Sequence, residues 1–174
     1  MKKLILLGTI AMGAMVMLAQ PQKKMPASPP MDTIVSIGDQ TVSVKYSAPS
    51  VKGRKIFGGL VPYGQVWRAG ANSATALHTD GDLMIGKLMV PKGDYTLYVL
   101  PAADSWQLIV NKQTGQWGTE YNEGQDLGRV KMTVTKAAAP IELFKISLSP
   151  VGGKQLTLKM EWEETVAIVP LTVH

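Results

Sequence analysis

Hydrophobic and polar residues alternate along much of the chain after residue 32. The pattern is clearest in four segments: 41–47, 105–111, 129–135 and 155–162. In the first of them, Val42, Val44 and Tyr46 would share one face of a strand, because successive side chains point to opposite faces. The matching residues of the other segments are Trp106, Leu108 and Val110; Val130, Met132 and Val134; and Leu156, Leu158, Met160 and Trp162. Each segment therefore predicts a strand with one face on a core and one in solvent.

Turn signals separate the alternating segments. Asp80-Gly81 suits a hairpin turn between ATALHT and DLMI, and Gly86-Lys87 suits a second one between LMI and LMV. Pro91-Lys92-Gly93 suits a type I turn, and the stretch SPVGGK, residues 149–154, separates two further strands. We find no strong helical period after the N-terminal region. The sequence therefore predicts an all-β fold, an antiparallel β-sandwich or flattened barrel of roughly nine or ten short strands.

The N-terminal region differs in composition from the rest of the chain. Residues 1–19 combine two lysines, an apolar run and a small residue at the end, which predicts a signal peptide. Residues 20–31 contain four prolines and no period, so we expect a linker, followed by a single domain over 32–174. Because the chain has no cysteine, it has neither a lipobox anchor nor disulfides. We therefore expect a periplasmic or secreted protein.

Charge adds little to this interpretation. Without Lys2 and Lys3, 16 of the 18 basic residues remain against 13 acidic ones, so the formal charge falls from +5 to +3. The lysines are scattered and form no stripe, so we expect no nucleic-acid partner. The apolar run at the N-terminus is short for a spanning helix, so we expect no stable membrane span after removal of the signal.

No catalytic constellation stands out. Outside the N-terminal region the possible histidine bases are His78 and His174, and no serine lies in a G-x-S-x-G motif. His78, Asp80 and Asp82 are two residues apart and would share a face of a continuous strand, where they could bind a divalent cation. The turn predicted at Asp80-Gly81 would break that strand. The sequence therefore predicts no catalytic residue, no metal ligand and no cofactor.

Two further groups of residues, in segments 112–126 and 52–60, contain side chains that suit catalysis or ligand binding. Glu120, Glu123 and Asp126 lie beside Trp117 and Tyr121 in the long polar segment 112–126, and a pair of carboxylates next to aromatic rings is the minimum for glycoside hydrolysis. Solvated loop charges explain them more simply.

The segment KGRKIFGGL, residues 52–60, is basic and rich in glycine but is not a phosphate-binding P-loop. Arg54 and Lys55 could still meet an anionic ligand.

The stretch VPYGQVWRAGANSAT, residues 61–75, has no clear period and mixes aromatic, cationic and amide side chains. A guanidinium beside large aromatic rings can hold a carboxylate or stack on a sugar or base. We therefore expect a ligand site of Tyr63, Trp67, Arg68 and Asn72, faced by Trp117 and Tyr121 from the long loop. The alternative, which the residues alone favour, is a structural plug in which Arg68 and Asn72 satisfy backbone groups and Trp67 caps the core.

Several long segments resemble a known bacterial family. The blocks SVKGRKIFGGLVPYGQVWRAGANSAT, IGKLMVPKGDYTLYVLP, WQLIVNK followed by QWG, LGRVKMTV and LTLKMEWEETVAIVP are similar to those of the family called domain of unknown function 2911. The resemblance covers about residues 45–170 and is most distinctive from Gly53 to Asn72. It implies an exported, mainly β bacterial protein. It implies no reaction and brings no catalytic residues with it.

The function that these observations favour is a non-enzymatic, exported binding or interaction module. Its partner would be a small polar ligand, a glycan or a cell-envelope protein, bound by residues on irregular segments of a rigid scaffold. Two alternatives remain: a glycoside hydrolase-like enzyme that uses the carboxylates of segment 112–126, and a purely structural component of the envelope.

Overall fold

The computed structural model describes residues 26–103 and 105–174. Its elements in those ranges are β1 (Pro30–Ile37), β2 (Gln40–Ser47), β3 (Thr75–Thr79), β4 (Leu83–Ile85), β5 (Leu88–Val90), β6 (Gly93–Pro101), β7 (Trp106–Asn111), the 3-10 helix η1 (Glu123–Gln125), β8 (Asp126–Gly152) and β9 (Gln155–Val173). No α-helix occurs within them, so the all-β prediction is confirmed. Within the same residues, no helix is long and apolar enough to cross a membrane.

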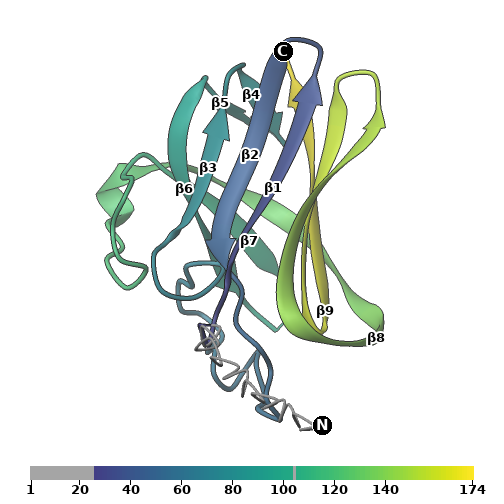
Figure 1. The fold of residues 1–174 in the computed structure, drawn as a ribbon. Helices are drawn as coiled ribbons and strands as arrows, with labels where there is room; N and C mark the ends of the chain where they lie inside the picture. Colours follow the sequence, from purple (N-terminus) through teal and green to yellow (C-terminus); the bar gives the residue numbers. More distant parts are fainter. Residues whose placement is uncertain (1–25, 104) are drawn as a thin grey trace, which may run out of the picture.

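The strands form one nine-stranded antiparallel sheet that folds back on itself without closing (Figure 1). Its order is β1-β2-β3-β6-β7-β8-β9-β4-β5. The start of β8 pairs with β7, whereas the rest of β8 pairs with β9, so this strand belongs to both halves of the folded sheet. The sequence predicted short strands, but β8 has 27 residues and β9 has 19. Their ladder continues across irregularities near Ile141 that bend both strands, and a period of two cannot reveal such continuity.

Both edges of the sheet end beside β8. At one edge β1 approaches the later part of β8, where the amide of Leu148 donates to the hydroxyl of Thr33 at 3.3 Å. At the other edge β5 lies against the first part of β8, so that a Cβ on Gly128 would strike the side chain of Leu88 at 2.5 Å. We call these two boundaries the β1–β8 seam and the β5–β8 seam. Because no strand ladder forms across either seam, the sheet is an open sandwich and not a closed barrel.

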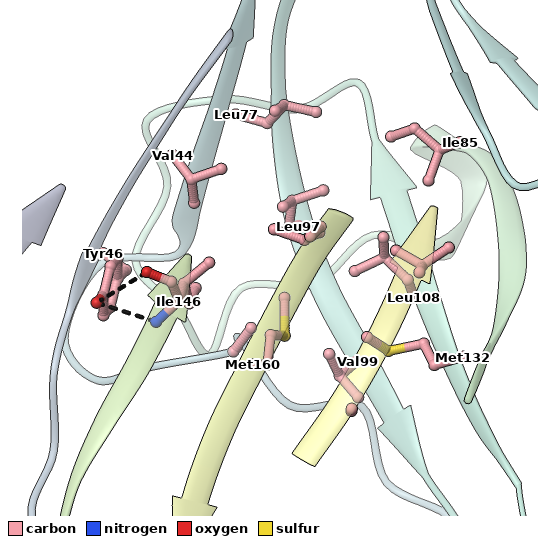
Figure 2. Close-up of a cluster of buried hydrophobic side chains, with 14 of the residues drawn as sticks. Val44, Tyr46, Leu77, Ile85, Leu97, Val99, Leu108, Met132, Ile146 and Met160 are labelled. Carbon is pink, nitrogen blue, oxygen red and sulfur yellow. Dashed lines mark hydrogen bonds between the residues drawn. The ribbon is translucent and has the colours of Figure 1, made fainter. Parts of the chain in front are cut away.

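Most of the alternating residues form the core as predicted, and Val130 is partly buried against it. Figure 2 shows side chains from both halves of the sheet meeting between them. The predicted inward residues of β2, β7 and the start of β9 are all buried. Val134, however, is 38% exposed, because β8 crosses there from one half of the sheet to the other. Ile109 is buried although it belongs to the opposite face of β7, because the loop after β7 covers that face.

The turn predictions are only partly correct. Gly86 and Lys87 connect β4 and β5, with Gly86 at a φ of 57° in a two-residue hairpin, and the glycines at 152–153 connect β8 and β9. The hairpin at Asp80-Gly81 is wrong. β3 pairs with β2 and β6, whereas β4 pairs with β5 and β9, so residues 80–82 carry the chain between the two halves of the sheet.

The beginning of the chain is described only in part. β1 begins at Pro30, inside the stretch that the sequence assigned to a linker. The amide of Ala48 donates to the carbonyl of Pro29 at 2.9 Å, which ties the residues before β1 to the end of β2. The predicted signal peptide, residues 1–19, lies outside the described residues.

Candidate functional site

The connection between β2 and β3 crosses one end of the folded sheet (Figure 1). It contains the stretch 61–75, which has no regular strand of its own before β3. Trp67 nevertheless exchanges two backbone hydrogen bonds of 2.8 Å with Val99 of β6. This short pairing anchors the middle of the connection to the edge of the core.

The side chain of Trp67 belongs to an aromatic cluster. Its ring stacks on Trp162 with a centroid distance of 5.7 Å and an angle of 17°, and it makes edge contacts with Phe57 and Phe144. The indole N–H donates to the carbonyl of Gly70 at 3.1 Å. Trp67 is only 9% exposed. It therefore caps the core, as the plug interpretation expected.

A cavity of about 340 Å³ lies over this cap, and we call it the end cavity. Trp67 and Trp162 form part of its wall, and three cationic side chains share the lining: Lys52, Arg54 and Arg68. The segment before β1 contributes Ala27 and Ser28. A site can therefore coexist with the plug, because the same connection that seals the core also walls the cavity.

Arg68 is held between this cavity and the long loop. A Cβ on Gly118 would collide with Cδ of Arg68, so the arginine stem packs directly on the backbone of that glycine. Its Nε is buried, and no described residue accepts a hydrogen bond from it. Burial lowers the pKa of Arg68 below its ordinary value. A buried donor without a partner is unusual in a folded protein, and this one lies on the side of Gly118 and the long loop.

Backbone strain gathers around the same cavity. Four non-glycine residues in the described ranges have a left-handed φ: Lys52 (48°), Ala69 (51°), Asn72 (60°) and Glu163 (54°). Lys52 lines the end cavity, and each of the others directly adjoins a lining residue in the sequence. The carboxylate of Glu163 accepts the amide of Ile56 at 3.3 Å, which helps to hold this conformation. Such conformations cost about 1–3 kcal/mol each and tend to occur at functional sites.

The long loop after β7 covers the outer face of β6 and β7. The hydroxyl of Tyr98 donates to the carbonyl of Glu120 at 3.0 Å and accepts from the side-chain amide of Gln116 at 2.8 Å. Tyr98 is paired with Ile109 across the two strands, so the loop buries both side chains. This cover explains why Ile109, on the outer face of β7, is buried.

Tyr121 belongs to this loop's internal support. Its ring contacts Tyr98 edge-on, and its hydroxyl donates to Asp126 at 2.6 Å. Burial raises the pKa of Tyr121 to about 12, and the bond to Asp126 adds to the effect. Arg129 donates to Asp126, Glu123 and the same hydroxyl. Two of the three carboxylates considered for hydrolysis therefore contact one guanidinium, an arrangement that favours a structural role for them.

The structure brings some of the predicted site residues together and separates others. Trp67 and Arg68 line the end cavity. Asn72 meets the long loop through its backbone, because its carbonyl accepts the amide of Gly118 at 3.0 Å. Tyr63 and Trp117 are 46% and 53% exposed. Neither of these, nor Asn72 or Tyr121, is part of the cavity lining.

Eleven of the thirteen lining residues were not among the predicted site, and Lys52 and Trp162 are two of them. Lys52 lies in the basic segment that suggested an anionic ligand, next to Arg54, which was considered. Trp162 was assigned to the core by its alternation in β9, and it is 2% exposed. The basic segment was the available signal for Lys52. No local pattern could show that Trp162, in the first half of β9, meets the connection between β2 and β3.

His78 lies outside this region, on the outer surface of β3. Its Nδ1 is 2.8 Å from Asp94, and its Nε2 is 3.0 Å from Asp80. Asp82 points elsewhere and accepts the amide of Lys92 at 2.8 Å. Within the described ranges, no group of three potential metal ligands comes together.

Comparison with known proteins gives a single result. No curated protein and no solved structure gives a significant match to this chain. A family model described as "Protein of unknown function (DUF2911)" matches residues 28–171, which include every lining residue of the end cavity except Ala27. The chain therefore belongs to the DUF2911 family of proteins of unknown function.

Proposed function

We propose that this protein is an exported binding module that holds a small polar ligand in the end cavity. The observation that carries the proposal is the gathering of all four left-handed non-glycine residues of the described ranges around one cavity. Strain of this kind persists only where the surrounding structure enforces it. A connection that served only to seal the core would have no need to keep its strained residues at a hollow.

The size and the lining of the cavity support the same function. Its volume of about 340 Å³ lies in the range of small-molecule sites. Such sites combine an apolar wall with a few polar groups that fix the orientation of the ligand. Here the indoles of Trp67 and Trp162 supply the wall, and Arg68 supplies a guanidinium. This combination suits binding of a compact ligand more than recognition of a flat protein surface.

Export is the second part of the proposal. It rests on the lysines, the apolar run and the small residue within residues 1–19. Fractionation of the producing cells tests it: the protein should appear in the periplasm or the medium and should lack its first residues by N-terminal sequencing. Uncleaved protein in the cytosol would contradict it.

A thermal-shift screen with the purified protein tests the binding function. The panel contains sugars, peptidoglycan fragments, organic acids, amino acids and nucleotides. A ligand at about a hundred times its Kd adds roughly 2.7 kcal/mol to the native state, which moves the midpoint by several degrees. We expect a shift that disappears in Arg68→Gln while the fold remains intact. Lys131→Gln, on the first part of β8, is the matched control and should keep the shift.

Two results would contradict the proposal. One is a panel with no shift at all. The other is a shift that persists in Arg68→Gln, because the ligand would then bind elsewhere on the protein.

A further inference from the structure

We propose that the ligand of the end cavity is a small polyanion, a phosphorylated or polycarboxylated molecule held by Lys52, Arg54 and Arg68. The inference rests on the proposed binding function and names its ligand class. It follows from the charges around the cavity, from the way in which two of these side chains are held, and from the volume available.

The cavity lining carries positive charges that no acidic residue of the lining balances. Of its thirteen residues three carry a positive charge, and none is Asp, Glu or His. Among the described residues, no carboxylate lies within the ion-pair distance of 4.0 Å from any of the three. The nearby Glu142 accepts the backbone amide of Lys52 at 2.9 Å, so its contact is with the main chain and not with the ammonium group. Like charges that share a hollow repel one another, and an anion placed between them would relieve that repulsion.

The guanidinium of Arg54 is fixed before any ligand arrives. Its Nε donates to the carbonyl of Val51 at 3.0 Å, and its Nη2 donates to the carbonyl of Ser50 at 2.6 Å. A guanidinium has five N–H donors, so further donors remain for an anion. Because the group is already ordered, binding costs less conformational entropy than it would for a free surface arginine.

Arg68 adds the second prearranged donor. Arg68 lines the cavity, and its stem is pressed against the backbone of Gly118, where its Nε is buried, so the position of the guanidinium is restricted before a ligand arrives. Hydrogen bonds from a guanidinium to phosphate or carboxylate oxygens are short and strong. A neutral ligand would leave the charge of this half-buried group uncompensated, whereas an anion would neutralise it.

The number of cations indicates more than one negative charge on the ligand. One carboxylate could compensate only one of the three positive charges. Phosphate monoesters and di- or tricarboxylates carry two or more charges in a volume that fits about 340 Å³. The indole wall beside the cations would take the uncharged part of such a molecule.

Isothermal titration calorimetry at low ionic strength tests the inference. The probes are inorganic phosphate and citrate, with glucose as the neutral probe. We expect at least one anion to bind and glucose not to. We expect Lys52→Gln and Arg68→Gln each to weaken that binding by about tenfold or more, the fold-change for losing a hydrogen bond to a charged group. Half-molar sodium chloride should weaken it as well.

Lys131→Gln is the control, because Lys131 lines a separate hollow of about 610 Å³ at the β5–β8 seam together with Lys87 and Arg129. The variant should bind the anion like the wild type. Lys52 is exposed, so its variant tests the inference even if Arg68→Gln fails to fold. Whether phosphate or citrate binds more tightly distinguishes the two sources of charge.

Three results would overturn the inference. The first is that neither anion binds. The second is that binding survives Lys52→Gln and is lost in Lys131→Gln, which would move the anion to the seam. The third is a neutral ligand from the thermal-shift screen whose binding depends on Arg68 but not on Lys52. In that last case the binding function would stand and the anionic class would be wrong.

Discussion

The hydroxyl of Tyr46 makes two hydrogen bonds with the backbone of Ile146. It accepts the amide at 3.0 Å and donates to the carbonyl at 3.4 Å (Figure 2). The two residues are 100 positions apart in the sequence, on β2 and β8. At the β1–β8 seam, β1 and β8 form no ladder. The hydroxyl there makes the hydrogen bonds that a neighbouring strand would otherwise make with the backbone of Ile146. A side chain thereby satisfies buried backbone groups that an unclosed sheet would leave without partners.

Tyr46→Phe should destabilise the protein by about 1–3 kcal/mol, because the amide and the carbonyl of Ile146 would remain buried without a partner. Urea unfolding measures the change. Tyr63→Phe is the control, since Tyr63 is 46% exposed and should tolerate the loss of its hydroxyl. Equal unfolding midpoints for both variants would show that water or strand movement replaces the Tyr46 hydroxyl.

Asn111 anchors the long loop from the end of β7. Its amide nitrogen donates to the carbonyl of Asn122 at 2.9 Å and to Asp126 at 2.8 Å, while its oxygen accepts the amide of Gln113 at 2.9 Å. Asn111→Asp would remove both donated bonds and place a carboxylate beside Asp126. We expect a loss of about 3 kcal/mol in urea unfolding, because Asn111 is fully buried.

Asn122→Asp is the matched control for that change. Its side chain accepts the amide of Gly124 at the start of η1, and an aspartate can accept the same bond. We expect its unfolding midpoint to stay close to that of the wild type. A similar loss in both variants would mean that added charge in the loop, and not the anchor, decides stability.

Gly118→Ala should weaken both the loop contact and the end cavity. The new Cβ would collide with Cδ of Arg68 and lie 2.6 Å from the carbonyl oxygen of Asn72, which is backbone and cannot yield. We expect a loss of about 1–3 kcal/mol and weaker binding of any ligand that depends on Arg68. Gly124→Ala is the control, because the nearest atom to its Cβ is 3.2 Å away, at the end of a side chain. Wild-type binding by Gly118→Ala would show that the position of Arg68 does not matter.

Alternation along the chain was sufficient to predict the fold class. It identified the inward faces of β2, β7 and the start of β9, because each of these faces meets the opposite half of the sheet. It did not predict the burial of Ile109, since that depends on a loop folding back over β7. The exposure of Val134 was missed for a similar reason: it depends on where β8 passes between the two halves.

The hairpin error at Asp80-Gly81 has a physical cause. The same residues suit a tight turn and a short crossover, so local chemistry cannot choose between them. The choice is made by packing: the side chain of Gln40 lies against Gly81, and the amide of Asp80 donates to the carbonyl of Thr41 at 3.0 Å. Both contacts come from the β1–β2 end of the sheet and direct the chain toward its other half.

The candidate site was predictable in part. Arg68 and Trp67 were identified because a guanidinium next to an indole in an irregular segment is a recognisable combination. Tyr121 was placed opposite them because it lies in a long polar loop, but its part of that loop packs on Tyr98 of β6 instead, and Gly118 is the loop residue that meets Arg68. Lys52 and Trp162 reach the cavity from parts of the chain whose meeting is decided by the tertiary structure alone.

The two tryptophans of the predicted site should respond differently to truncation. Trp67→Ala would empty the centre of the aromatic cluster and should cost about 3–5 kcal/mol. Trp117 is 53% exposed, so Trp117→Ala should stay within about 0.5 kcal/mol of the wild type. Urea unfolding followed by circular dichroism measures both. A large loss for Trp117→Ala would instead indicate that the loop needs this ring to cover β7.

His78 should make stability depend on pH. Both ring nitrogens face carboxylates, so the charged imidazolium is favoured. The bond to Asp94 is the largest cause that raises the pKa of His78, and the bond to Asp80 adds to it. The same contact with His78 lowers the pKa of Asp80. These bonds contribute fully below the unfolded histidine pKa of about 6.5, and the contribution is lost as pH rises through the higher folded value.

The measurement compares the wild type with His78→Gln in urea unfolding from about pH 5 to pH 9. The wild type should be the more stable of the two at the acidic end, and the difference should shrink as pH rises. It should be small and sensitive to salt, because the His78 side chain is 46% exposed. Lys45 lines the same surface hollow as His78 and Asp94, and its positive charge opposes the imidazolium. Lys45→Gln should therefore move the decline to higher pH. A difference that is constant across the range would mean that His78 contributes through packing and not through its charge.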